Sequence, residues 1–287
     1  MSPDNHAKGN CISGSIVIFQ TQDCYGGKIK DDNDLFQIAD HTEINPATGP
    51  LYIYGAAHGD ILKIDILNIA LGAQGCMALL PGHGPLGKFI KKEKTKTFKI
   101  KNGHVEFNKM FKIPVSPMIG VIGTSPKDAS ISTGTPGEHG GNMDCKKIRN
   151  DTTLYLQVNV DGALLSIGDL HAVMGDGETA TCAVETAGEA TVRVTVLKNI
   201  KIPTPLLRTE DEYVTISSAK TLDKACEAAS KKMLYLLGVA TDMDVNERIM
   251  LLSLVGSMEI CQVVNPLKTA RTTIPSWILE QYNFALP

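Results

Sequence analysis

The sequence lacks the patterns of a membrane protein, a nucleic-acid binder and a disulfide scaffold. No apolar run in its 287 residues approaches the roughly 18 residues that cross a bilayer. Lys and Arg number 28 against 31 Asp and Glu, so the basic excess of a general nucleic-acid binder is missing. The cysteine count is 7, an odd number without a CxxC pair, which favours reduced cysteines in the core. With no signal-peptide pattern at the start, we expect a cytoplasmic protein.

Several familiar catalytic motifs are also missing. The sequence has no GxSxG elbow, no GxxxxGK[ST] phosphate loop, no HExxH and no GxGxxG that opens a helix. These absences argue against a serine hydrolase of the α/β type, a nucleotide-binding loop and a zincin. All 7 histidines lie before residue 172, so any imidazole chemistry must come from that part of the chain.

Short alternating segments dominate the chain up to about residue 213. With 26 Gly and 14 Pro, the composition favours many short strands joined by turns. The stretch His58-Gly59-Asp60 separates two apolar segments, 50–55 and 61–67, and predicts a hairpin. Asn102-Gly103 predicts a second tight turn. Further strands are expected at residues 15–19, 97–101, 153–160, 163–167 and 190–197.

The hydrophobic period changes near residue 218 from that of strands to that of helices. Apolar residues from Leu222 to Leu237 share one helical face, with Gly238 as the expected stop. Asp244 and Glu247 have the spacing of a capping box that opens a second helix, and residues 259–264 follow as a strand. We therefore predict a mainly β protein. A β-sandwich-like or barrel-like domain (1–210) would carry the active site, followed by a small α/β domain (211–287).

Residues 133–185 concentrate the candidate chemistry. The segment TGTPGEHGGNMDCKK places His139, Asn142 and Asp144 on a glycine-rich loop. Asp169 and His171 are two residues apart, so an extended strand would put both side chains on one face. The turn Asp176-Gly177-Glu178 would fold Glu178 back towards them. Imidazoles and carboxylates are the donors that a zinc site uses.

Each of these residues also has a plain structural interpretation. His171 could be a hydrogen-bonded core histidine, and Asp161 and Asp176 could simply make turns. His58 and His83 are interpreted as surface residues. Cys145 could act as a nucleophile with His139, but we expect the nearby carboxylates to raise the pKa of its thiol. Metal chemistry is therefore the preferred interpretation.

Three long motifs resemble the acetamidase/formamidase family. They are PGEHGGNMD at 136–144, GALLSIGDLHAVMGDGE at 162–178 and NPATGPLYIYGAAHGDIL at 45–62, and the tail ending in IPSWIL is also similar. The resemblance implies hydrolysis of a short-chain carboxamide, such as formamide or acetamide, to ammonia and the acid. It implies a β-rich N-terminal domain with a smaller α/β part, bound zinc or calcium, and a homodimer or homotetramer.

A mechanistic hypothesis then assigns roles to the residues that match the family motif. Zn²⁺ would be held by Asp144, Asp169 and His171, with Ca²⁺ as another possible ion. Glu178 would be the base, Asn142 or the Gly140-Gly141 backbone would bind the oxyanion, and His139 would be a fourth ligand or the acid. Glu178 as ligand with His139 as base is an equally good assignment. The remaining residues that match the family motif, and would support the ligands, are Asp176 and Glu185.

Two other functions remain open at this point. Hydrolysis of a cyclic amide or imide would use similar chemistry. A non-enzymatic β protein could hold a metal with the same carboxylates. A small amide substrate, without nucleic acid or membrane partners, is the expectation.

Overall fold

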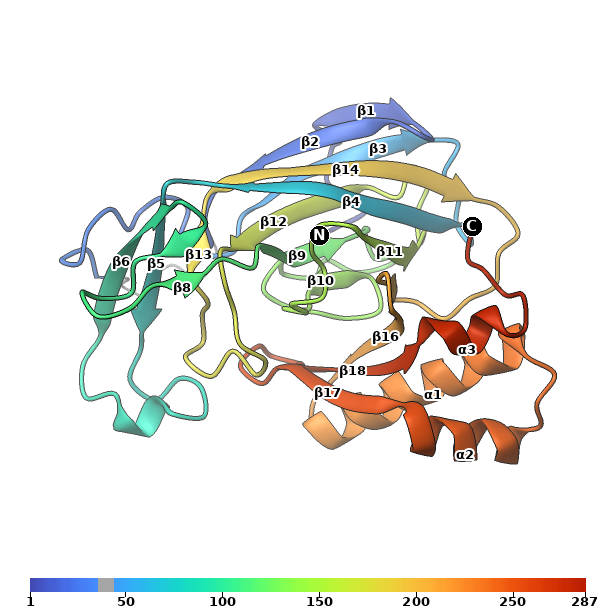
Figure 1. Ribbon diagram of the computed structural model, residues 1–287. Coiled ribbons are helices and arrows are strands. Elements are labelled where there is room, and N and C mark those ends of the chain that lie inside the picture. Colours follow the sequence, from blue (N-terminus) through green and yellow to red (C-terminus); the bar gives the residue numbers. More distant parts are fainter. Residues whose placement is uncertain (36–43) are drawn as a thin grey trace.

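Two large β-sheets form most of the molecule in the computed structural model, which describes residues 1–35 and 44–287 (Figure 1). His41 lies outside the described residues. The mainly β prediction is confirmed.

The first sheet has ten described strands in the order β1-β3-β12-β13-β5-β6-β7-β8, with β9 also paired to β12 and β10 to β9. Only the β1–β3 pair in this sheet is parallel. The strands of this sheet are β1 (Gly9–Ile12), β3 (Ala47–Tyr54), β5 (Gln74–Leu79), β6 (Lys94–Lys101), β7 (His104–Val105), β8 (Ile113–Pro114), β9 (Met118–Gly123), β10 (Gly140–Asn142), β12 (Leu165–His171) and β13 (Glu185–Thr186).

The second sheet has eight described strands in the order β17-β18-β16-β15-β11-β4-β14-β2, all antiparallel. Its strands are β2 (Ile16–Thr21), β4 (Ile61–Leu71), β11 (Thr152–Gln157), β14 (Gly188–Leu197), β15 (Leu206–Arg208), β16 (Glu212–Ala219), β17 (Ser257–Gln262) and β18 (Lys268–Pro275).

The main core lies between these two sheets. Ile64 of β4 and Val192 of β14 share one buried cluster with Ile122 of β9 and Ile167 of β12. Alternation explains which side chains enter it, because Leu62, Ile64 and Ile66 are almost completely buried while Lys63 and Asp65 stay partly exposed. The two inner faces thus bury their apolar residues against each other, as in a sandwich.

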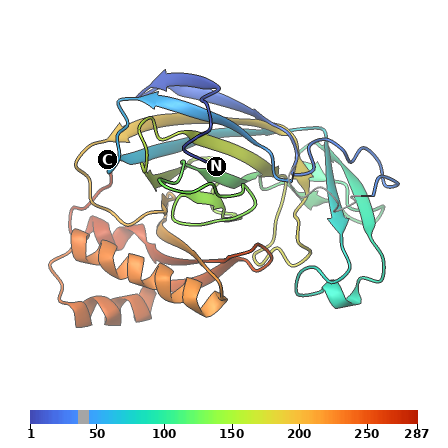
Figure 2. The ribbon, with the colours of Figure 1, turned by 180° about the vertical axis from the view of Figure 1, so that it is seen from behind.

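Helices gather beside the C-terminal strands (Figure 2). They are α1 (Leu222–Ala240), α2 (Val245–Val255) and α3 (Ser276–Glu280), and a short 3₁₀ helix, η2 (Gly87–Phe89), lies apart from them. Helix α1 buries Met233 and Leu237 against residues of β16 and β18, in a cluster that includes Tyr213 and Ile274. The predicted capping box of α2 is confirmed, because Asp244 accepts hydrogen bonds from Asn246 and Glu247 while the Glu247 side chain accepts one from the Asp244 N–H.

Two local predictions are wrong. Residues 50–55 and 61–67 do not form a hairpin, because β3 pairs with β1 and β12 whereas β4 pairs with β11 and β14 of the other sheet. The turn at His58 instead carries the chain from one sheet to the other. Helix α1 also passes through Gly238 to Ala240, and a Cβ at Gly238 would lie only 2.0 Å from a guanidinium nitrogen of Arg248 on α2.

The eight-stranded sheet continues through the expected domain boundary at residue 210, since β15 pairs with β16 across it. The division into two domains stays a prediction. Among the described helices, none combines the length and the apolar character needed to cross a bilayer.

Candidate active site

Three buried side chains from separate segments converge on one point. Asp144 follows β10, His171 ends β12, and Glu178 follows the turn after β12. One ligand atom from each of them lies within 4.8 Å of the other two. The structure thus brings together three of the residues that the sequence analysis expected to cluster, while Asp169 belongs to a second group of potential ligands.

His171 lies at the centre of the carboxylates. Its Nε2 is 3.5 Å from Oδ1 of Asp169, 3.9 Å from Oδ1 of Asp144 and 3.1 Å from Oε2 of Glu185. The strand register explains the last contact, because Glu185 of β13 lies directly opposite His171 of β12. The predicted meeting of Asp169 and His171 on one strand is also confirmed.

Two asparagine side chains hold the aspartates in place. With its amide nitrogen turned towards the carboxylates, Asn142 donates to Oδ2 of Asp144 at 3.0 Å and to Oδ2 of Asp169 at 3.1 Å. Asn265, which follows β17, donates to Oδ2 of Asp144 at 2.6 Å. The Asn142 amide therefore positions carboxylates, and the Gly140 N–H already donates to Gly137. The Asn142 amide and the Gly140 N–H, two of the groups expected to bind the oxyanion, thus already have partners within the protein.

The backbone is strained at three of the acidic residues. Asp144, Asp169 and Glu178 have φ values of 45°, 57° and 48°, in the left-handed region that non-glycine residues rarely occupy. Such conformations persist where the surrounding structure enforces them, and they gather at functional sites. Here the strain turns three carboxylates towards one histidine.

The turn that carries Glu178 is tied to the C-terminal strands. The Gly177 N–H donates to the carbonyl of Cys261, and the Val263 N–H donates to the carbonyl of Gly177. Arg271 of β18, almost completely buried, donates to both carboxylate oxygens of Asp176 at 2.8 Å. Asp176 thus anchors the turn through a bidentate ion pair, and its support of the metal ligands stays a prediction.

Burial makes this cluster electrostatically costly without a cation. It raises the pKa of Glu178 well above its usual value, and the neighbouring Asp144 carboxylate raises it further. Burial likewise raises the pKa of Asp144 to about 6 and that of Glu185 to about 7. Burial alone would lower the pKa of His171, but the Glu185 and Asp169 carboxylates raise it well above its usual value. The cluster therefore holds more negative charge than its single imidazole can balance.

The same residues fit a divalent cation. Both ring nitrogens of His171, Oε2 of Glu178 and Oε2 of Glu185 are buried without a hydrogen bond, and Nε2 of His171 has only the ionic contacts with carboxylate oxygens given above. Buried polar atoms almost always have hydrogen-bond partners. Four atoms without a hydrogen bond in one cluster therefore indicate a ligand that the protein itself does not supply. An imidazole surrounded by carboxylates is a donor set that Zn²⁺ accepts, and the oxygen donors also suit harder ions.

One predicted participant, His139, lies apart from this convergence. His139 is buried and its Nε2 has no hydrogen-bond partner, yet among the described residues it joins neither group of potential ligands. Burial lowers the pKa of its imidazole to about 4, and the nearby N-terminal amine lowers it too. A Cβ at Gly141 would lie 2.9 Å from His139 Nε2. The missing side chain of Gly141 therefore makes room for the His139 imidazole.

Cys145 differs from its prediction. Its thiol pKa is lowered to about 7, not raised, because contact with Cys261 outweighs burial and the Arg271 guanidinium adds to the effect. The side chain is completely buried in the main core cluster. The prediction that the cysteines are reduced is confirmed for all seven.

Sequence reasoning missed Cys24, Asn45 and Asn265. All three line a pocket of about 430 Å³ that also reaches Asn142. With the Asn142 amide turned as above, the Asn45 side-chain amide donates to the side-chain oxygen of Asn142 at 2.7 Å. Asn45 and Asn265 each precede a proline, a pattern that by itself indicates only a turn. His83, predicted to be a surface residue, is exposed at the rim of this pocket.

Gly120 offers a direct test of this packing. A Cβ at Gly120 would lie 2.6 Å from Oδ1 of Asp144 and 2.6 Å from Oδ2 of Asp169. We expect Gly120→Ala to displace both carboxylates and to weaken zinc binding at least about tenfold in isothermal titration calorimetry. Gly9→Ala is the control, since its Cβ would make only an ordinary 3.6 Å contact with Leu51. Unchanged zinc affinity in Gly120→Ala would contradict the assigned geometry.

Solved structures share this fold closely. An acetamidase from Bacillus halodurans is 45% identical, with a TM-score of 0.97 over 99% of this chain and 96% of that chain. A predicted acetamidase/formamidase from Thermoanaerobacter tengcongensis is 42% identical, again with a TM-score of 0.97, over 99% of this chain and 95% of that chain.

Curated sequences are more distant. A putative formamidase of Schizosaccharomyces pombe is 28% identical over 258 residues, which is 69% of this chain and 63% of that protein. The chain spans about three fifths of the length of the first curated relatives it matches, 63% and 59%. A family model described as the Acetamidase/Formamidase family matches residues 1–134 and 127–271. The chain therefore belongs to the acetamidase/formamidase family.

Proposed function

We propose that this protein hydrolyses short-chain carboxamides, such as formamide and acetamide, to ammonia and the carboxylic acid. Family membership and relatives named acetamidase and formamidase support this substrate class. The observation that carries the proposal is the convergence of Asp144, His171 and Glu178 beside a pocket that reaches Asn142 and Asn265. Those asparagines hydrogen-bond Asp144, so a small molecule in the pocket lies next to the buried cluster.

The cation of this site is proposed to be Zn²⁺ on Asp144, Asp169 and His171. Zn–O and Zn–N bonds of about 2.0–2.2 Å place two donors of a tetrahedral ion about 3.5 Å apart. The His171 Nε2 is 3.5 Å from Asp169 and 3.9 Å from Asp144, close to that spacing. Zn²⁺ bound there would acidify a coordinated water and polarise the amide carbonyl. Ca²⁺ is the alternative ion, since oxygen donors outnumber nitrogen.

Glu178 is proposed to move the proton. Its Oε2 is buried without a hydrogen-bond partner, and its carboxyl lies beside Asp144 and His171. A carboxyl group with a raised pKa can both accept and return a proton near neutral pH. Oε2 would take one proton from the attacking water while the C–O bond forms. It would then give that proton to the amide nitrogen as the C–N bond breaks and ammonia leaves.

The cellular location and the assembly of the protein are proposals too. We propose a cytoplasmic homodimer or homotetramer. Helix α2 supports assembly, because it buries none of its side chains and exposes Ile249, Met250 and Leu254.

A substrate panel tests the proposed reaction. We expect ammonia release from formamide, acetamide and propionamide, measured with a coupled ammonia assay on the zinc-loaded protein. A five-membered cyclic amide, followed by chromatography of the ring-opened product, tests the other reaction. Turnover of the cyclic amide alone, or of no amide, would contradict the proposal.

Replacing Glu178 separates a base from a ligand. We expect Glu178→Gln to reduce turnover by about 10²–10⁴-fold with its zinc content unchanged, because the amide cannot accept the proton. Zinc content is measured by mass spectrometry on the sample used for kinetics. Glu227→Gln is the control, since Glu227 lies on exposed α1 surface and pairs only with Lys231 among the described contacts. Loss of zinc would make Glu178 a ligand, and undiminished turnover would exclude the base assignment.

A further inference from the structure

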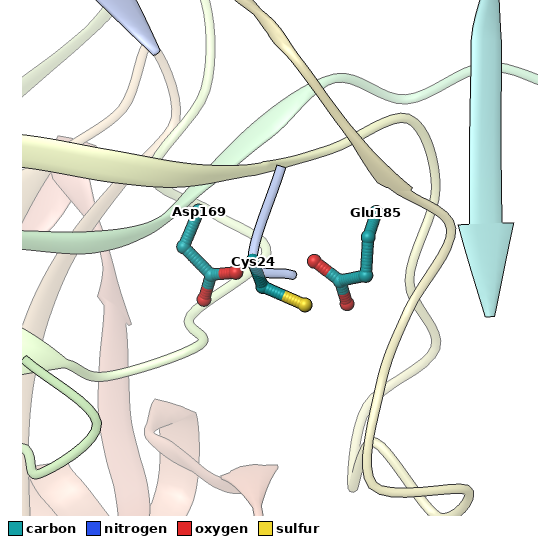
Figure 3. Close-up of side chains that lie close together, drawn as sticks. All are labelled: Cys24, Asp169 and Glu185. Carbon is teal, nitrogen blue, oxygen red and sulfur yellow. The ribbon is translucent and has the colours of Figure 1, made fainter. Parts of the chain in front are cut away.

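A cysteine and two carboxylates form a second convergence next to the first. One ligand atom each of Cys24, Asp169 and Glu185 lies within 4.8 Å of the other two, and all three residues are buried (Figure 3). Figure 3 shows the Cys24 thiol between the two carboxylates. Cys24 comes from the turn after β2, so a segment far away in the sequence supplies this donor.

The thiol is held by a well-ordered turn. Asp23 Oδ1 accepts hydrogen bonds from the N–H groups of Tyr25 at 2.9 Å and Gly27 at 3.0 Å. The Cys24 carbonyl accepts the N–H of Asn45 at 2.9 Å. These bonds fix the backbone on both sides of the cysteine. The position of the thiol therefore follows from the turn and does not depend on a flexible loop.

Glu185 points to a ligand that the protein itself does not supply. Its Oε1 accepts the N–H of Ala183 at 2.7 Å, which fixes the carboxylate. Its Oε2 is buried, forms no hydrogen bond and lies 3.1 Å from Nε2 of His171, and the residue is only 1% exposed. A carboxylate oxygen desolvated in this way is costly unless a cation or a donor meets it.

We propose that Cys24, Asp169 and Glu185 bind a second divalent cation, a thiophilic one such as Zn²⁺, so that the buried cluster holds two ions. A thiolate donor selects zinc over calcium or magnesium, which prefer oxygen. Asp169 has two carboxylate oxygens and can offer one to each ion. Binding releases the thiol proton of Cys24. The second site is argued from its own three donors. Only the sharing of Asp169 with the first site rests on the proposed function.

An ion can reach this position from solvent. Cys24 lines the same pocket of about 430 Å³ as Asn45 and Asn142. Donors of one tetrahedral zinc lie about 3.5 Å apart. The present spacing of at most 4.8 Å therefore closes with side-chain adjustments of about 1 Å.

Cobalt substitution tests the proposal through the sulfur. Co²⁺ bound by a thiolate absorbs in the near ultraviolet by charge transfer, whereas carboxylate and imidazole ligands give no such band. We expect metal-free protein titrated with Co²⁺ to take up two equivalents, with the band growing as the thiolate site fills. Cys24→Ala should lose the band and one equivalent of metal. Cys182→Ala is the matched control, because Cys182 is also buried nearby but donates to the Ala78 carbonyl.

A second variant keeps the test valid if Cys24→Ala does not fold. Glu185→Gln retains the shape of the side chain and the thiol, and we expect it to weaken the band-forming equivalent at least about tenfold. Absence of the band from cobalt-loaded wild-type protein, or its persistence in folded Cys24→Ala, would overturn the second site. An active one-metal enzyme without the band would refute this site alone. Two bound ions with the band, but no turnover of any amide, would refute the proposed function alone.

Discussion

The charge of a buried carboxylate cluster is the constraint on which the rest of the site depends. Asp144, Asp169, Glu178 and Glu185 surround one imidazole, His171, at positions almost closed to water. Charges taken out of water are stable only when they are paired or bound to a cation. Burial raises the pKa values of Glu178, Asp144 and Glu185, and the neighbouring carboxylates raise them further. A divalent cation would offset this buried negative charge, which is why the site and its ion are treated together.

The fold holds this cluster together with parts that each have a structural cost. Three acidic residues adopt left-handed backbone conformations. Gly120 leaves room for Asp144 and Asp169 because it has no side chain. The buried Arg271 pairs with Asp176 and so anchors the turn of Glu178 to β18. The C-terminal strands thus contribute to the site through Asn265 and Arg271, although they carry no histidine.

Local sequence patterns predicted most strands and a helix start, because these depend on residues that are close together in the chain. Period-two alternation located most strands, and the Asp244–Glu247 spacing located the start of α2, because both are short-range effects. The hairpin at His58 was wrong because alternation shows which residues are buried, but not in which sheet a strand pairs.

Sequence analysis identified the site residues that lie close together in the chain, and it missed those that distant segments contribute. His171, Asp169, Asp144 and Glu178 lie in two adjoining motifs, so their meeting could be expected from sequence. Cys24 and Asn265 approach the same cluster from the two ends of the chain, and only tertiary packing brings them there. The lowered pKa of Cys145 was also not predictable, since Cys261 and Arg271 produce it from the C-terminal strands.

The most direct test of this account is to measure acetamide hydrolysis and bound zinc on one sample during removal and return of the metal. The protein is dialysed against a chelator, assayed for ammonia release, and titrated back with Zn²⁺ while circular dichroism follows the fold. The account predicts that turnover falls in proportion to the metal removed and returns as zinc rebinds. Full turnover by a folded protein that retains no metal would contradict it.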